Sequence, residues 1–493
     1  MPVLGAGLGV WHSRGMVNLV RRWLPFALVA LAALWLRTHA LGERPMHADE
    51  ANQAVKFGAL LENGEYRFDP GDHHGPTLYY AALIPAWLRG QTTLAALTET
   101  TVRLTPAAFG VLAVLLVGAL AQPLGRGAMV AAAAWLAVAA PAVYFSRYFI
   151  QETLLVTFTL GALVAGQQWW RTRRLAWAVA AGACAGSMLA TKESAVVFIG
   201  AAAVALAVVR PAGPSRAALR RHGIVAGLVA LAVAGVLYTS WLRNPGGAGD
   251  ALEAVVRGFS RATGGETGHE KPWWYYLTLF TFRGGKGWGR MFFLALVVGG
   301  AFSTYWRPSR LMRFAAVYTG LVAVAISLAP YKTPWIVVNL LPGCAVLAAG
   351  FLAALAEKST AGRVLAAGLG AVTVAALALQ TKFAAFDRPY GAGNPLAYVH
   401  SGADVKKVPA LARQAGAGAI KAIGEEYWPL PWYLRASPNV GYWTTPPADC
   451  DAALIFATQT QAEAVRARLH GRYRENLLGL REGVLLVVFT REK

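Results

Sequence analysis

The chain has 493 residues, of which 56% are hydrophobic and only 14% are charged, and its mean hydropathy is +0.43. This composition excludes an ordinary water-soluble protein and indicates a polytopic membrane protein. The formal net charge of +21 does not indicate nucleic-acid binding, because the basic residues fall in short clusters between apolar segments. The three cysteines are scattered and have neither metal-binding nor disulfide spacing.

The first apolar segment, residues 24–41, follows Arg21 and Arg22, which favours a start-transfer helix over a cleaved signal peptide. Further apolar segments reach the length that a helix needs to cross a bilayer. Clusters of Arg and Lys between them orient the chain with its N-terminus inside and its C-terminus outside. Eleven spans are predicted, near residues 24–41, 103–121, 128–146, 153–170, 175–190, 194–209, 223–241, 289–306, 312–330, 335–353 and 361–380.

The first outer loop, residues 43–102, contains two adjacent acids, Asp49 and Glu50, directly after the first span. Carboxylates next to hydrocarbon mark ion, proton or substrate chemistry, although solvated loop charges give the same pattern. In the same loop the apolar segment from Pro76 to Trp87 is predicted to be an interfacial helix. If that segment crossed the membrane, Asp49 and Glu152 would lie on opposite sides.

With this threading, the polar loops of the chain collect on one side of the membrane. They are the loop 43–75, the turns 147–152, 191–193 and 331–333, the loop 244–288, and all residues after 381. Convergence of charged residues from many helices at one face predicts an active site or binding cavity there.

Hydropathy falls after residue 381, which divides the chain into a transmembrane domain, 1–380, and a soluble extracytoplasmic α/β domain, 381–493. The second domain has strand-like runs at 453–456 and 484–489. Its predicted role stays open between a lid, acceptor binding and partner docking. An aromatic, proline-rich segment from Tyr427 to Arg435 is suited either to stacking on sugars or to packing the domain against the membrane part.

Several short motifs in the outer loops resemble those of the GT-C membrane glycosyltransferases. The likeness is to the dolichyl-phosphate-mannose protein mannosyltransferases, the aminoarabinose transferases and, most of all, the flippase-activity-associated archaeal and bacterial glycosylation proteins. The motifs are His47-Ala-Asp49-Glu50, His73-His74-Gly75-Pro76, Ser146-Arg147-Tyr148 with Glu152, Thr191-Lys192-Glu193-Ser194, Tyr331-Lys332-Thr333-Pro334-Trp335 and Asn394 to His400.

The resemblance implies transfer of a sugar from a polyprenyl-phosphate donor to an extracytoplasmic protein, lipid or glycan acceptor. It implies that Asp49 is the general base for the acceptor hydroxyl and that Glu50 orients this base or holds the sugar. If both carboxyl groups are buried, their proximity raises the pKa of one of them.

Three cations in outer turns, Arg147, Lys192 and Lys332, are candidates for binding the departing phosphate. Their alternative role is to snorkel to headgroups or set the topology. Tyr148 and Trp335 line the sugar or prenyl groove in one interpretation and belong to the interfacial aromatic belt in the other. The glycine-rich stretch 284–287 is interpreted as a mobile gating loop.

A divalent metal ion, Mn²⁺, Mg²⁺ or Zn²⁺, is a further expectation from the resemblance. Glu152 and His74 are its candidate ligands together with Asp49, since carboxylate and imidazole suit such ions. The single acid at the second position leaves a metal-free site as the alternative.

Two other functions fit a polytopic chain with outer-face charges: a flippase for lipid-linked sugars and a non-catalytic partner in glycan assembly. The absence of an internal sequence repeat and the placement of polar residues at helix ends favour an enzyme. Expected partners are the polyprenyl-phosphate sugar, membrane lipid and an unspecified acceptor. The Ala- and Arg-rich composition indicates a prokaryotic plasma membrane.

Overall fold

The computed structural model of the chain describes residues 23–72, 74–210, 213, 215–264, 268–281, 288–306, 309–391 and 393–492. The predicted gating loop at 284–287, the first histidine of the His-His-Gly-Pro motif and the basic pair before the first span lie outside the described residues.

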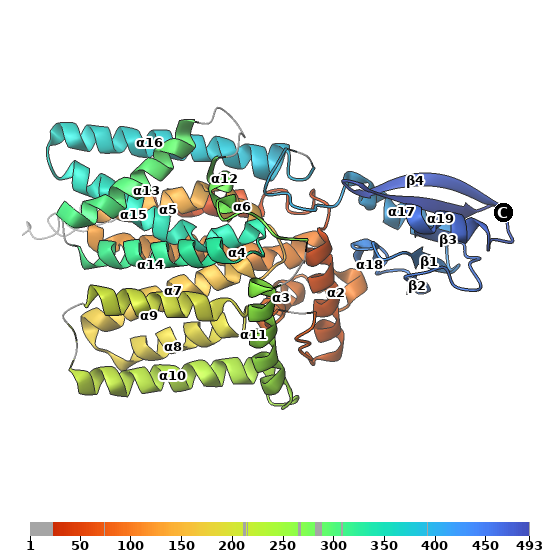
Figure 1. Ribbon diagram of the computed structural model, residues 1–493, viewed down its shortest axis with the longest axis horizontal. Coiled ribbons are helices and arrows are strands. Elements are labelled where there is room, and N and C mark those ends of the chain that lie inside the picture. Colours follow the sequence, from red (N-terminus) through yellow and green to blue (C-terminus); the bar gives the residue numbers. More distant parts are fainter. Residues whose placement is uncertain are drawn as a thin grey trace, which may run out of the picture.

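Long apolar helices form a bundle that contains most of the chain (Figure 1). A helix is found at each of the eleven predicted spans. They are Trp23–Thr38, α4 (Glu99–Ala121), α5 (Arg126–Val138) with α6 (Ala140–Phe145), α7 (Glu152–Thr172), α8 (Leu175–Leu189), α9 (Ala195–Val209), α10 (Arg216–Tyr238), α13 (Trp288–Trp306), α14 (Arg310–Leu328), α15 (Leu341–Ala356) and α16 (Thr360–Lys382).

Five helical segments among the described residues are long and apolar enough to cross a membrane by length and composition. Several others are apolar but shorter than a full span. The third predicted span is broken into α5 and α6 at Ala139, two residues before Pro141, because proline offers no N–H to the helix. The total of eleven crossings therefore stays a prediction.

Small residues allow the bundle helices to approach closely. At Gly182 and Gly186 of α8, an added Cβ would collide with backbone atoms of Ala226 and Ala230 on α10. Gly300 of α13 faces the backbone of α15 in the same way. Close backbone approach at small residues is how helices associate in lipid, where apolar burial gives no driving force.

One end of the bundle is covered by the shorter helices α2 (Ala48–Asn63), α3 (Thr77–Leu88) and α11 (Gly247–Thr263), whereas the short α12 (Tyr275–Thr281) packs beside α13. Helices α2 and α11 run across the direction of the bundle helices (Figure 1). With 12 residues, α3 is too short to cross a bilayer, which fits the predicted interfacial helix. This end corresponds to the predicted outer face.

The C-terminal part forms a five-stranded sheet with the order β2-β1-β3-β5-β4. Its elements are α17 (Val408–Ala415), β1 (Ile420–Ile423), α18 (Leu430–Tyr433), β2 (Val440–Trp443), β3 (Leu454–Thr458), α19 (Gln459–Arg466), β4 (Tyr473–Arg481) and β5 (Val484–Arg491). Strand β1 is parallel to β2 and β3, whereas β5 is antiparallel to β3 and β4. Strands β1 to β4 therefore all point the same way.

The sheet unit is docked on the outer end of the bundle by specific polar contacts. The indole Nε1 of Trp432 donates to the Glu99 carboxylate at 2.9 Å, and the Arg435 guanidinium donates to the Leu97 carbonyl at 2.7 Å. The hydroxyl of Tyr433 accepts a hydrogen bond from the amide of Met46 at 2.9 Å. The second half of the aromatic segment thus packs the C-terminal unit against the bundle.

Candidate active site

A cavity of about 360 Å³ lies between the outer end of the bundle and the C-terminal sheet. We call it the acidic pocket, because three carboxylates line it. Its lining residues are His47, Ala48, Asp49, His269, Tyr331, Thr333, Trp335, Tyr398 and Val399 from the bundle side, and Glu425, Glu426, Tyr427, Trp428 and Arg481 from the sheet unit.

Asp49 stands in the first turn of α2 with its side chain 49% exposed. His47 caps this helix: its Nδ1 accepts a hydrogen bond from the Asp49 amide at 3.0 Å. The helix N-terminus favours a negative charge at this place. The structure therefore presents the Asp49 carboxylate to the acidic pocket, as the predicted general base requires.

Glu50 is the opposite case, because its side chain is fully buried. Its carboxylate receives two hydrogen bonds of 2.8 Å from the Arg103 guanidinium and one of 2.9 Å from the Phe149 amide, and Arg44 lies 3.5 Å away. Burial would raise the pKa of Glu50, but Arg103 and Arg44 hold it at about 2. A raised pKa was expected only if both acids were buried, and this condition is not met because Asp49 is exposed. The geometry gives Glu50 a structural role.

The bundle side of the acidic pocket is organised by two histidines and Tyr398. The Nε2 of His47 donates to the Tyr398 carbonyl at 3.0 Å, since its Nδ1 is already an acceptor. His269 Nδ1 is 2.7 Å from the Tyr398 hydroxyl. Val399, half exposed in the pocket, has a φ of 48°, a strained conformation for a β-branched residue that is common at functional sites.

Two of the three predicted phosphate ligands donate to main-chain carbonyls. The Arg147 guanidinium donates to Leu36 and His39 at 3.1 and 2.6 Å, at the end of the first helix. The Nζ of Lys332 donates to the carbonyls of Lys271 at 3.0 Å and Ala329. Both side chains are buried, so in this structure they tie loops together and do not face the pocket.

The third predicted phosphate ligand, Lys192, forms an ion pair with Glu152. Beside it, His74 Nδ1 lies 3.0 Å from the Glu193 carboxylate. Burial lowers the pKa of Lys192, but the Glu152 charge outweighs this effect and raises it above the ordinary value. Lys192 is also within electrostatic reach of Tyr331, which lines the acidic pocket.

The expected metal ligands do not form a metal site in this arrangement. Among the described residues, no three His, Cys, Asp or Glu side chains lie close enough together to hold an ion, so Asp49, Glu152 and His74 are not gathered. Glu152 also faces the ammonium of Lys192, and a cation competes with a metal for the same carboxylate. The residues present therefore do not fit the expected ion.

The two predicted aromatic residues lie in different places. Trp335 lines the acidic pocket, where the centre of its ring lies 6.2 Å from that of the Tyr398 ring. Tyr148 is buried below the pocket, and the Arg44 guanidinium lies 3.9 Å from its ring centre. Tyr148 thus belongs with the Glu50 network as a cation–π partner.

The C-terminal side of the acidic pocket begins directly after β1. Gly424 has a φ of 131°, and a Cβ there would collide with the Thr458 side chain at the end of β3. Glycine adopts this backbone conformation without strain, so the chain can turn tightly here before Glu425 and Glu426. Glu426 forms an ion pair with Arg481 at the end of β4.

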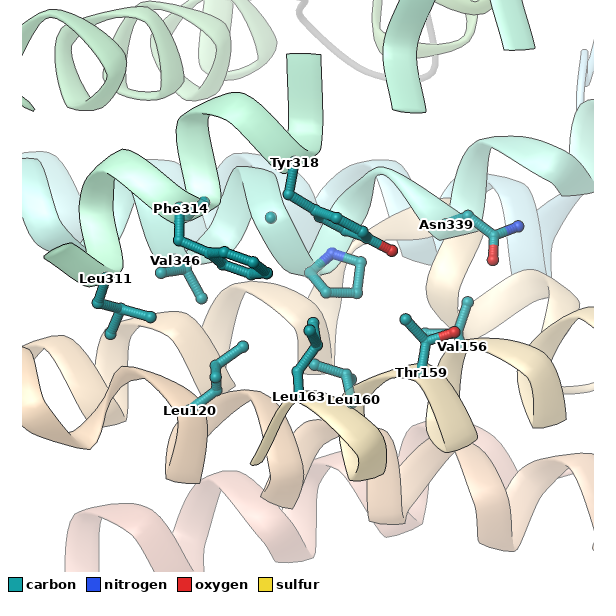
Figure 2. A pocket seen from close by; sticks show the side chains of 13 residues that line it. Leu120, Val156, Thr159, Leu160, Leu163, Leu311, Phe314, Tyr318, Asn339 and Val346 are labelled. Carbon is teal, nitrogen blue, oxygen red and sulfur yellow. The ribbon is translucent and has the colours of Figure 1, made fainter. Parts of the chain in front are cut away.

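A second cavity, about 20 Å³, lies within the bundle between α4, α7, α14 and α15. Figure 2 shows Phe314 and Tyr318 of α14 above Leu120 and Leu160. Its lining is almost entirely aliphatic and aromatic and holds no carboxylate, ammonium or imidazole group. The acidic pocket is therefore the candidate active site.

The sequence reasoning missed four charged or polar residues of the pocket, His269, Glu425, Glu426 and Arg481, and included Tyr398 only within the motif from Asn394 to His400. One signal was available for two of them, because Glu425 and Glu426 immediately precede the aromatic segment that was interpreted as a sugar-stacking candidate. Nothing in the sequence pattern marks Arg481, since only the sheet brings it to the pocket.

Comparison with known proteins supports the resemblance seen in the motifs. Residues 80–239 match the model of the dolichyl-phosphate-mannose-protein mannosyltransferase family. No curated protein is similar enough to this chain to count as a match.

Several solved structures share the fold across nearly the whole chain. ArnT from Cupriavidus metallidurans bound to undecaprenyl phosphate has a TM-score of 0.66 at 16% identity, over 94% of this chain and 97% of that one. The oligosaccharyltransferase AglB from Archaeoglobus fulgidus, in complex with an inhibitory peptide and a dolichol-phosphate, has a TM-score of 0.57 at 13% identity. The match covers 85% of this chain and 64% of that one. The Archaeoglobus fulgidus oligosaccharyltransferase in complex with zinc and sulfate has a TM-score of 0.58 at 13% identity, over 93% of this chain and 73% of that one. The chain thus has the fold of the GT-C membrane glycosyltransferases.

Proposed function

We propose that this protein is a glycosyltransferase that moves a sugar from a polyprenyl-phosphate carrier to an acceptor hydroxyl on the outer face of the membrane. The observation that carries the proposal is the half-exposed Asp49 carboxylate in an aromatic pocket at the outer end of a GT-C fold. The structural relatives that hold undecaprenyl phosphate and dolichol-phosphate support this class of donor.

In the proposed reaction, Asp49 accepts the proton of the acceptor hydroxyl as its oxygen attacks the anomeric carbon of the sugar. The bond between that carbon and the phosphate oxygen breaks, and the carrier leaves as polyprenyl phosphate. Asp49 then releases the proton to water. A positioned base of this kind contributes about 10²- to 10⁴-fold to the rate.

Lys192 is the proposed cation for the leaving phosphate. It is 12% exposed while paired with Glu152, and it interacts electrostatically with Tyr331, which lines the acidic pocket. In this proposal Glu152 keeps the ammonium charged and oriented, and a phosphate oxygen becomes its second partner. No step of the proposed reaction requires a metal.

The test is transfer of radiolabelled sugar from polyprenyl-phosphate donors by purified protein in nanodiscs. Asp49→Asn should reduce the rate about 100-fold or more, whereas Asp250→Asn should not change it. Asp250 is a matched control because it also stands in the first turn of an outer helix, α11. Equal rates for Asp49→Asn and wild type would remove the base assignment.

A flippase gives a different result when the same purified protein is reconstituted in proteoliposomes. It would move a lipid-linked sugar across the bilayer of proteoliposomes without transferring it to any acceptor. Translocation without transfer would therefore reject the enzyme in favour of that alternative.

A further inference from the structure

The acidic pocket has two sides of different origin. Asp49 and Trp335 come from the bundle, at the level where a membrane-bound carrier ends, whereas Glu425 to Trp428 and Arg481 come from the sheet unit. The sheet unit extends away from the bundle (Figure 1). A group that contacts the sheet side therefore arrives from the aqueous side, and in a transfer reaction that group is the acceptor.

The sheet side of the pocket lies at a position where α/β proteins commonly bind ligands. Strands β2 and β3 lie on opposite sides of β1, so the strand order reverses between β1 and β3. Glu425 follows the carboxyl end of β1, and Arg481 ends β4, which points the same way. Ligands of open α/β sheets bind outside the carboxyl ends of the strands at such a switch point.

The chemistry of the sheet side is that of a carbohydrate site. The rings of Tyr427 and Trp428 are 5.9 Å apart with an interplanar angle of 29°, and both are half-buried. Tyr427 also contacts Tyr442 at 5.1 Å. Aromatic faces bind the apolar face of a sugar ring, and the exposed Glu425 carboxylate next to them accepts hydrogen bonds from its hydroxyl groups.

The charged side chains that line the pocket are mostly acidic. Among the described residues, three carboxylates line it, those of Asp49, Glu425 and Glu426, together with one guanidinium, Arg481, which is paired with Glu426. An anionic group bound beside Glu425, on the sheet side of the pocket, would be repelled by that carboxylate.

We infer that Glu425, Tyr427 and Trp428 form an acceptor subsite that binds an uncharged or cationic sugar and excludes an anionic one. This inference rests on the proposed function, of which it names the acceptor class. The subsite is fixed relative to Asp49, because Trp432 and Arg435, a few residues further on, anchor the same segment to Glu99 and Leu97.

The test measures binding of soluble probes to the full chain in nanodiscs by saturation-transfer NMR. The probes are methyl glucoside, glucosamine, glucuronic acid and a short serine-containing peptide at neutral pH. Wild type should bind the first two, and glucuronic acid about tenfold more weakly. Glu425→Gln should reduce this discrimination several-fold, and Trp428→Ala should weaken binding of all three sugars.

The matched control is Glu463→Gln, which removes an exposed carboxylate of the same sheet unit, on α19, outside the pocket. Binding of undecaprenyl phosphate by each variant shows that the bundle is folded. Any of three results would overturn the inference. They are equal binding of charged and uncharged sugars, unchanged binding in Trp428→Ala, and binding of the peptide but not of the sugars. Equal transfer by wild type and Asp49→Asn, or no transfer by wild type, with intact sugar discrimination would instead reject the proposed function alone.

Discussion

Asp49 and Glu50 are neighbours in the chain, yet one faces the acidic pocket and the other lies in the protein interior. Consecutive residues of a helix point about 100° apart, so the first turn of α2 directs one carboxylate outward and the other toward Arg103. The exposed acid is available to a substrate, whereas every oxygen of the buried acid is bound by the protein. Two adjacent acids of one motif can therefore have different roles, one facing the substrate and the other stabilising the fold.

The largest expected effect is on stability, in Glu50→Gln. This change leaves the buried guanidinium of Arg103 without its counter-charge, and breaking a buried ion pair costs about 3 to 5 kcal/mol. The thermal midpoint of the purified protein should fall strongly, with little folded protein recovered. A midpoint equal to that of wild type would show that the Glu50 network is not structural.

The acid dependence of stability sharpens the same comparison. The pKa of Glu50 is lowered to about 2 in the folded protein, against about 4.3 in the unfolded chain. Its contribution, about 3 kcal/mol, is thus present above pH 4.3 and lost as the pH falls toward 2.

Thermal midpoints measured between pH 6 and 2 should show this loss in wild type and in Asp49→Asn alike. Glu50→Gln has no carboxyl group to titrate at this position, so its smaller stability should fall less steeply over the same range. An equal slope for all three proteins would contradict the assignment.

The smallest effect is expected at the contact between the sheet unit and the bundle. Trp432→Phe keeps an aromatic ring but removes part of the buried indole and its hydrogen bond to Glu99; the lost hydrogen bond alone costs about 1 kcal/mol. The thermal midpoint should fall slightly, and the rate of transfer should stay near that of wild type. A large loss of transfer would show that the position of the sheet unit is set mainly by this bond.

The sequence predicted the helical segments well, because long apolar runs between basic clusters leave few alternatives. It also placed Asp49 and Trp335 at the outer face, and both line the acidic pocket. The aromatic segment was given two alternatives, and the structure confirms the packing one, because Trp432 packs against the bundle. Tyr427 lines the pocket, so sugar stacking stays a prediction.

The partners of the charged residues could not be predicted. Arg103 lies 53 residues from Glu50 along the chain, and no local pattern indicates that the two meet. Likewise, Arg147 was a candidate phosphate ligand only because its partners, the carbonyls at the end of the first helix, are invisible in a sequence. Charge in an outer turn indicates the membrane face of a residue but does not show whether folding neutralises it.

The most direct test of the account compares Asp49→Asn with Glu50→Gln in one preparation, measuring the thermal midpoint and the rate of sugar transfer per folded protein. We expect Asp49→Asn to keep the wild-type thermal midpoint and to transfer sugar about 100-fold more slowly or worse. For Glu50→Gln we expect a lower thermal midpoint as the main effect. An Asp49→Asn protein that transfers sugar at the wild-type rate would contradict the central claim.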